Sequence, residues 1–371
     1  MLSKISLKKW GLVIIILILL TVITNFLTGA PSPVASEFHG GEEDYYRGKV
    51  LEVETQTTEQ GYWQEAEVEI TDGPYQGEIT QIESQYEEGN RFLDIKLEED
   101  LEIVLVSFVE NEERKFHLQD IARDNTLLRM AILLGLALLI VGGVKGLKTI
   151  ITLFITGYIL VQVLFPLLLQ GYSPIPVATL TALVMIGLIL LVIGGLNGKT
   201  AAAIVGTGIG VGVAGILAYY AGNAAELSGL GTQEAQMLAV GAQTIDVRGL
   251  LFAGIIIGSL GAVTDVGMSV ASSAYQLKEA STNISSAELI SHAMAVGRDI
   301  MGTMANTLIL AYVGGAIPLI LLIMAQEMSW VRIINMDFLA TEIISGIAGT
   351  LGLIIAIPVT AVIAGMFFGH R

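Results

Sequence analysis

The sequence predicts a mainly α-helical, multi-pass membrane protein of about eight transmembrane helices, with a small extracytoplasmic β-barrel domain between helices 1 and 2. The 371-residue chain is 53% hydrophobic and only 15% charged, whereas soluble domains are about 25% charged. Long apolar segments recur along the chain, as membrane-spanning helices require. After the first such segment, the hydrophobic pattern changes to the strict alternation that is typical of half-buried β-strands.

The negative charge is concentrated in one segment. Residues 30–125 carry 25 acidic and 7 basic side chains. Their net charge, 7 − 25 = −18, is more negative than the formal net charge of −16 for the whole chain. So acidic a domain disfavours nucleic acid and anionic lipid as partners. A solvated surface explains the charge, and weak binding of divalent cations is the alternative. The chain has no cysteine and four scattered histidines, so we expect neither a metal centre nor another cofactor.

The first element is an almost continuously apolar segment from Trp10 to Leu27, which follows three lysines. We expect residues 1–29 to form a transmembrane helix or signal anchor, because the segment is long for the core of a signal peptide. A cleaved signal peptide is the alternative, with small residues up to Ala35 as cleavage sites. Both interpretations place the following domain outside the cytoplasm.

The second domain, residues 30–125, is predicted to consist of short strands. Residues 65–71 alternate strictly between polar and apolar, and turn-forming residues stand at 72–75 and 87–90. Short strands at this spacing are typical of a small barrel of the OB or SH3-like kind. The strands are expected at residues 47–55, 65–71, 77–85, 92–97, 102–108 and 115–120.

The third domain, residues 126–371, is predicted to contain seven further transmembrane helices. The basic residues of its loops, together with the N-terminal lysines, fall on one side if the N-terminus is cytoplasmic. We therefore expect both termini in the cytoplasm and residues 30–125 on the other side of the membrane. The helices are expected near residues 127–144, 149–169, 175–195, 200–221, 249–275, 300–325 and 341–367.

Two loop segments carry further information. Residues 141–149 resemble residues 193–200, since both contain a Gly-Gly pair and a lysine between two apolar segments. This predicts a duplicated helical hairpin, as transporter folds often contain. The segment 277–299 predicts a short amphipathic helix at the cytoplasmic surface, capped by Ser285 or Ser286 with Glu288 behind it.

Two glycine-rich motifs imitate nucleotide-binding sequences. Gly198-Lys-Thr lacks the first glycine of a phosphate-binding loop and follows an apolar helix rather than a strand. The glycines of residues 206–212 lie inside an apolar segment, at the spacing that lets two helices approach closely. We therefore interpret both motifs as structural.

The candidate functional site is centred on Asp265, a single acid in the apolar segment 254–276. At helical spacing its face also carries Gly258, Gly261, Ser269 and Ser272. An ionisable group at membrane depth is costly and normally faces a bundle interior or a water-filled cavity. We interpret Asp265 as a proton or cation site, and an acid that is paired purely for packing is the alternative.

The following span supplies the other half of this site. Its residues Asp299, Thr303 and Asn306 share one helical face, and Arg298 is a candidate ion-pair or gate residue at the cytoplasmic boundary. Consecutive spans run antiparallel, so Asn306 and Asp265 are expected at depths that match within about one helical turn. The expected transport path comprises Asp265, Ser269, Ser272, Asp299, Thr303 and Asn306.

Three segments resemble the YibE/F family of bacterial membrane proteins. They are residues 258–273, residues 297–312 and the Val-Gly-Gly-Val-Lys-Gly stretch at 141–146. The resemblance implies a multi-pass protein of the bacterial plasma or inner membrane. It implies no activity, so the roles given to Asp265, Arg298, Asp299 and Asn306 depend on their chemistry alone.

We expect a transporter or channel in the lipid bilayer for a small solute or ion, with its polar site around Asp265 and Asn306. The first alternative is a non-transporting scaffold or sensor, whose β domain binds an extracytoplasmic protein partner. An intramembrane enzyme using Asp265 and Asp299 is a further alternative. We expect that the protein is not an enzyme, because Asp265 and Asp299 are predicted at different depths and neither lies in a Gly-Xaa-Gly-Asp motif. A homo-oligomer is compatible with each of these hypotheses.

Overall fold

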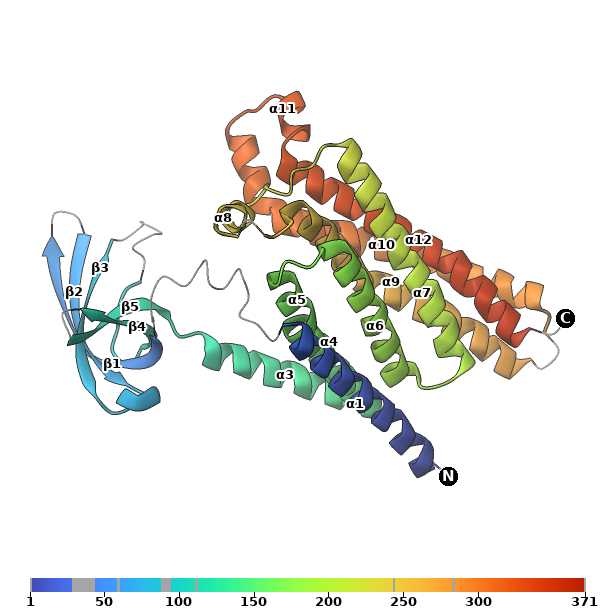
Figure 1. Ribbon diagram of the computed structural model, residues 1–371, viewed down its shortest axis with the longest axis horizontal. Coiled ribbons are helices and arrows are strands. Elements are labelled where there is room, and N and C mark those ends of the chain that lie inside the picture. Colours follow the sequence, from blue (N-terminus) through green and yellow to red (C-terminus); the bar gives the residue numbers. More distant parts are fainter. Residues whose placement is uncertain are drawn as a thin grey trace. The chain divides into compact units, whose positions relative to one another are not determined.

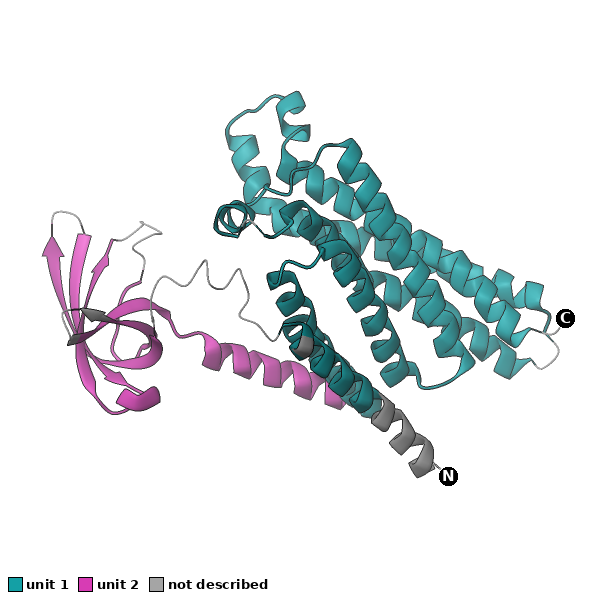
Figure 2. Ribbon diagram, in the orientation of Figure 1, with its two compact units in different colours: residues 1–38, 142–371 teal, residues 39–141 magenta. Residues whose placement is uncertain are grey.

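The computed structural model describes residues 2–28, 44–58, 61–87, 95–110, 113–242, 244–281 and 284–369. The chain forms two compact units, and Figure 2 shows them in different colours. One comprises residues 1–38 and 142–371, and the other comprises residues 39–141. Helices account for most of the chain, as the sequence predicts, and the strands are confined to the second unit.

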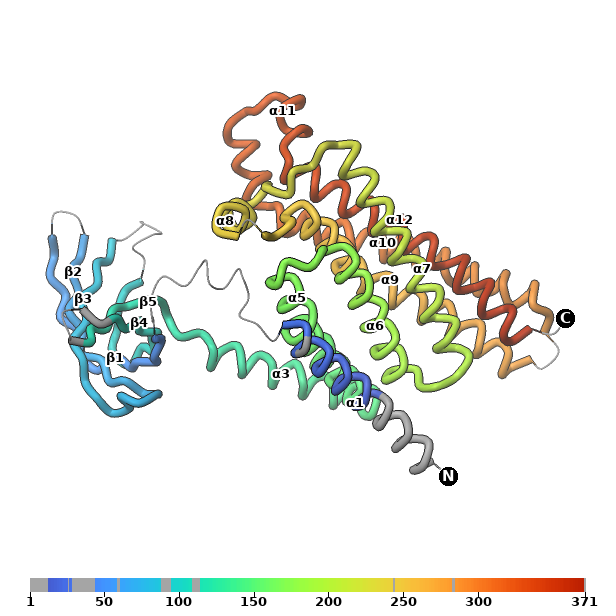
Figure 3. The backbone as a smooth tube through the Cα atoms, in the orientation of Figure 1, coloured from blue at the N-terminus to red at the C-terminus, as the bar shows by residue number. Residues whose placement is uncertain are grey.

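The helical unit is a bundle of long apolar helices (Figure 1). Figure 3 traces its backbone from α4 to α12. Its elements are α1 (Leu2–Leu27), α4 (Val144–Ile159), a π-helical turn η2 (Leu160–Leu164), α5 (Phe165–Leu169), α6 (Pro174–Gly194), α7 (Gly198–Ala224), α8 (Gln233–Gly241), α9 (Val247–Ala280), α10 (Ser286–Ala325), α11 (Trp330–Ile334) and α12 (Asp337–Phe368).

Within the described residues, seven helices are long and apolar enough to cross a membrane. Six belong to the bundle, with α4, η2 and α5 together forming one span, and the seventh is α3 (Asp124–Gly142) of the other unit. The described apolar part of α1 is shorter, at Val13–Asn25. Several spans therefore cross a bilayer, whereas the count of eight and the orientation remain predictions.

The second unit contains a five-stranded antiparallel sheet and α3. The strands are β1 (Asp44–Thr58), β2 (Gly61–Ile70), β3 (Ile79–Tyr86), β4 (Glu102–Glu110) and β5 (Glu113–Ile121), in the order β3-β2-β1-β4-β5. A single 3₁₀ turn, η1 (Gly73–Tyr75), occupies the predicted turn between β2 and β3. The outer strands β3 and β5 contact each other, so the sheet is curled, and a closed barrel remains a prediction.

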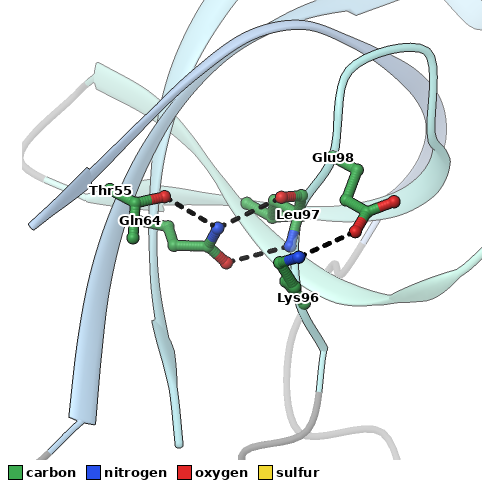
Figure 4. Close-up of polar contacts among 5 residues, drawn as sticks. All are labelled: Thr55, Gln64, Lys96, Leu97 and Glu98. Carbon is green, nitrogen blue, oxygen red and sulfur yellow. Dashed lines mark hydrogen bonds and ion pairs between the residues drawn. The ribbon is translucent and has the colours of Figure 1, made fainter. Parts of the chain in front are cut away.

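The strand predicted at residues 92–97 is absent where the structure can be read. Residues 92–94 lie outside the described residues, and Ile95 to Leu97 belong to no strand. Here the buried side-chain amide of Gln64, and not a neighbouring strand, forms hydrogen bonds with the backbone of Leu97. It accepts from the Leu97 N–H at 2.9 Å and donates to the Leu97 carbonyl at 3.1 Å and to Thr55 Oγ1 at 3.2 Å (Figure 4). One side chain therefore satisfies both backbone groups of Leu97 in this irregular segment.

The segment that begins at Ser285 is one continuous helix, α10, of 40 residues. The predicted capping box is confirmed. Ser285 Oγ accepts from the Glu288 N–H at 3.3 Å, and the Glu288 carboxylate accepts from the Ser285 N–H at 3.0 Å. The short helix predicted within residues 277–299 is the first part of α10 and runs without a break into the span. Gly297, which could have ended that helix, is buried against Ile357 of α12, and the helix continues past it.

Helices α7 and α12 pack through glycines. A Cβ atom on Gly206 would collide with Thr360, and one on Gly210 would lie 2.7 Å from the Gly352 carbonyl oxygen. Gly206 and Gly210 therefore let two helices approach closely, which confirms their interpretation as a packing motif, whereas no atom lies within 4 Å of a Cβ position at Gly212. Residues 198–200 open α7, where Asn197 caps the helix by accepting from the Thr200 N–H at 2.9 Å.

Candidate functional site

The polar face of α9 lies on the surface of the bundle. Gly258, Gly261, Asp265 and Ser269 are exposed, and Ser272 is half-buried. The other face of α9 carries valines 263, 266 and 270, which are fully buried in the bundle core. The two faces of α9 therefore differ: the apolar face packs against other helices of the bundle, and the face with small and polar residues is open.

The matching face of α10 is open as well. Thr303 and Asn306 are exposed, and so are Arg298 and Asp299 nearer the start of the helix. Thr303 Oγ1 donates to the Ile300 carbonyl oxygen at 2.9 Å, so its hydroxyl is satisfied within the helix. Among the described residues, the structure records no hydrogen bond or ion pair for Asp265 or Asn306. The carboxylate and the amide are thus available to a ligand.

Two contacts between α9 and α10 set their relative register. A Cβ atom on Gly258 would lie 3.0 Å from Tyr312 Oη, and one on Gly297 would lie 3.3 Å from Val270 Cγ2. Interpolation between these contacts places Asp265 level with Thr303, about one helical turn from Asn306.

The same register places Ser269 beside Arg298 and Asp299, about one turn nearer the start of α10. The predicted path residues therefore lie at matching levels on open faces of the two helices, and we call this set the α9–α10 seam. It comprises Gly258, Gly261, Asp265, Ser269, Ser272, Arg298, Asp299, Gly302, Thr303 and Asn306.

Glycines show that this seam is unfilled in the single chain. No atom lies within 4 Å of the position that a Cβ atom would take at Gly261 or Gly302. In the bundle core, by contrast, the corresponding positions at Gly206 and Gly210 are blocked by α12. The sequence suggested that the polar groups face the bundle interior. The structure instead places them on an open side of the bundle, because the buried side of α9 is occupied by its valines.

A second polar site was missed by sequence reasoning. A cavity of about 340 Å³ lies between α8, α9, α10 and α12, and Tyr312 and Glu342 both line it. The same two side chains line a neighbouring cavity of about 170 Å³ between α10 and α12. Glu342 could have been found in the sequence, since it is a lone acid near the start of the last predicted span, at residues 341–367. The cavity itself depends on loop packing that leaves no periodic signal.

The sheet domain carries a separate acidic surface. Five glutamates on β1, β2 and β3 line a shallow hollow of about 230 Å³. Its polar wall suits a basic partner better than an apolar one. The glutamates are Glu52, Glu54, Glu65, Glu67 and Glu83.

A bundle of long apolar helices with a polar seam, joined in sequence to a small antiparallel sheet domain, defines a multi-pass membrane protein with an extramembrane module. Residues 130–370, well over half of the chain, match the family described as YibE/F-like protein. The chain therefore belongs to the YibE/F-like family. A search of curated proteins and a search of solved structures found no match.

Proposed function

We propose that the protein is a transporter or channel for protons or small cations, and that the α9–α10 seam is its path. The observation that supports this most strongly is the pair formed by Asp265 and Asn306. Both polar groups lie in the middle of long apolar helices, at nearly the same level, with no partner among the described residues. A polar group at membrane depth without a protein partner needs water or a ligand.

The chemistry of the seam favours a cation. Asp265 supplies a negative charge, and the Asn306 amide oxygen and the serine hydroxyls supply neutral acceptors. These oxygen groups can replace part of the hydration shell of a small cation, as polar pore linings do. Asp299, level with Ser269, extends the negative potential along α10. Arg298, the preceding residue, places a positive charge that would repel a cation at that end of the seam.

The seam needs an opposite wall, because lipid tails cannot hydrogen-bond its polar groups. We propose that a second copy of the chain supplies this wall. Two-fold symmetry would bring the Asn306 amide of one protomer toward the Asp265 carboxylate of the other, and the reverse. The open glycines on both helices allow such a close approach. A chain with Gly302→Cys as its single cysteine should then form disulfide-linked dimers in membranes, and a chain with Ile209→Cys on α7 should stay monomeric.

Ion flux in reconstituted vesicles tests the proposed path. Proton flux is followed with a trapped pH-sensitive dye, and Na⁺ and K⁺ fluxes with radioactive tracers. We expect vesicles with the wild-type protein to conduct at least one of these ions. Asp265→Asn, which keeps the shape and removes the charge, should lower that flux at least about tenfold.

The control is Glu234→Gln, the same change at an exposed acid of α8 that lies outside the seam. It should leave the flux unchanged. Wild-type flux in the Asp265→Asn variant would contradict the proposal. So would wild-type vesicles that conduct none of the three ions faster than empty vesicles.

The acidic hollow on the sheet domain favours a second function, a sensor or scaffold that binds a basic protein segment outside the membrane. The two functions differ in what removal of residues 36–125 would do. A transporter that uses the α9–α10 seam should keep measurable flux without the sheet domain. A sensor should lose its response to the partner completely, and this loss should be reproduced by replacing the five glutamates with glutamines.

A further inference from the structure

The cavity of about 340 Å³ beside Glu342 is built by segments that are far apart in the sequence. The loop after α7 folds back onto the start of α12, where the Asp337 carboxylate accepts from the Ser228 N–H at 2.9 Å and from its hydroxyl at 3.2 Å. Gly231 lies so close to Phe338 that a Cβ atom would be 2.9 Å from the Phe338 Cα. Helix α8 closes one side with Ala235 and Leu238. The walls of the cavity are therefore held together by contacts between the loop after α7, α8 and α12.

The cavity wall is mainly apolar. Leucines of α8 and α9, Ile255 of α9 and Phe338 of α12 provide most of the lining. A concave, apolar site of a few hundred Å³ with a small number of polar groups is the usual form of a binding site for small organic molecules. The wall thus requires a ligand with an apolar body.

The polar groups of the cavity lack partners of their own. Tyr312 Oη is buried and has no hydrogen-bond partner. The Ser345 hydroxyl, in contrast, is already used, since it donates to the Thr341 carbonyl oxygen at 2.7 Å. For Glu342, the described residues show neither a salt bridge nor a hydrogen bond. Tyr312 Oη lies against Gly258, which does not line the cavity, so the open polar function of the cavity is the Glu342 carboxyl group.

No basic side chain of the described residues lines either cavity. Arg248 is next in sequence to the lining residue Val247, but its guanidinium is directed to α7, where it donates to the Gly222 carbonyl oxygen at 3.4 Å. The charge of Glu342 is thus without a built-in counter-ion. A ligand with a positive charge would supply it.

We propose that this cavity binds an organic ammonium ion, a protonated amine with an apolar body. The ammonium group donates hydrogen bonds to the Glu342 carboxylate, and charge-assisted bonds of this kind are the strong ones. The apolar body of the ligand contacts the leucines and Phe338, and Glu342 distinguishes it from a neutral molecule of the same shape.

The cavity also adjoins the proposed path. Gly254 and Tyr312 line it, and Tyr312 contacts Gly258, the first residue of the α9–α10 seam. A role as the outer substrate site of the transporter depends on the proposed function. Binding of the amine does not, and so the two ideas can fail separately.

Equilibrium binding to the full-length protein in lipid nanodiscs tests the inference. The probes are benzylamine, which is protonated at neutral pH, and benzyl alcohol, a neutral molecule of nearly the same shape. We expect saturable binding of benzylamine and no saturable binding of benzyl alcohol. Glu342→Gln should weaken benzylamine binding at least about tenfold.

Glu327→Gln is the matched control, because Glu327 is an exposed glutamate in the loop after α10. It should bind benzylamine as the wild type does. Glu342→Gln keeps the volume of the side chain, so thermal unfolding should show that the variant remains folded. Equal binding of the two probes, or unchanged binding to a folded Glu342→Gln variant, would overturn the inference.

The result can be separated from that of the flux experiment. Lost benzylamine binding together with Asp265-dependent ion flux would reject the amine site and leave the path intact. Normal, Glu342-dependent binding together with wild-type flux in Asp265→Asn would reject the path and leave the amine site intact.

Discussion

The contact between α7 and α12 leads to a prediction whose size follows from the geometry. In a Gly206→Ala variant, the new methyl group would lie 2.8 Å from Thr360 Cβ and 2.9 Å from Thr360 Cα, and closer still to the hydroxyl. Favourable carbon–carbon contacts are about 3.5–4.0 Å long. Rotation of the Thr360 side chain cannot relieve the contact with its Cα, so the two helices must separate by more than about half an ångström.

The expected cost is that of overpacking a core, about 1–3 kcal/mol. The change from glycine to alanine within a helix stabilises the helix by about 1 kcal/mol. The matched variant is Gly212→Ala on the same helix, where no atom lies within 4 Å of the new methyl group. At Gly212, the change to alanine therefore brings only the stabilisation of the helix, without the overpacking cost. The two variants should therefore differ in free energy of unfolding by about 1–3 kcal/mol, with Gly206→Ala the less stable.

Thermal unfolding of the purified protein in one detergent measures this difference. Gly206→Ala should unfold at a temperature several degrees below that of Gly212→Ala. Adding Thr360→Ala should recover part of the loss, because it removes the hydroxyl but leaves Cβ and Cα in place. Equal stability of the two glycine variants would refute the close packing of α7 on α12.

Two further predictions concern the sheet domain. Gln64→Ala should lower its free energy of unfolding by about 2–5 kcal/mol, since it leaves the buried N–H and carbonyl of Leu97 without partners. Hydrogen exchange at the Leu97 amide measures this loss. The control is Gln56→Ala, which should change the exchange rate little because Gln56 is exposed. A hydrogen bond from Lys49 lowers the pKa of Asp100. The stabilisation from this pair should therefore be present above the usual carboxyl pKa and disappear as the pH falls through the lowered one, and a domain with Lys49→Ala should unfold with a flatter pH dependence over that range.

Much of the fold could be predicted because its signals are local. The apolar spans follow from composition over about twenty residues. The start of α10 follows from Ser285 and Glu288, three residues apart, and the close contact of α7 follows from Gly206 and Gly210, four residues apart. Each of these patterns depends on neighbours within one or two helical turns, and each is found in the structure.

The misses depend on contacts between distant residues. The segment at residues 95–97 has the composition of a strand, and the sequence therefore predicts one. Its actual partner is the side chain of Gln64, more than thirty residues earlier, and no local pattern reveals this contact. In the candidate site, the sequence indicates which residues share a face with Asp265 but not which side of α9 the bundle occupies. Glu342 lies in a cavity only because the loop at Ser228 folds back onto α12.

The accessibility of the α9–α10 seam to water tests the proposed path most directly. The chain has no cysteine, so single cysteines can be introduced into an otherwise unreactive protein. Ser269→Cys places a thiol in the seam, and Ile209→Cys places one on an exposed apolar position of α7, where the side chain is 44% exposed. In intact membranes, a charged, membrane-impermeant methanethiosulfonate reagent should modify the cysteine at 269 and leave the one at 209 unmodified. If the cysteine at 269 is as unreactive as the one at 209, the seam is dry and the protein does not transport along it.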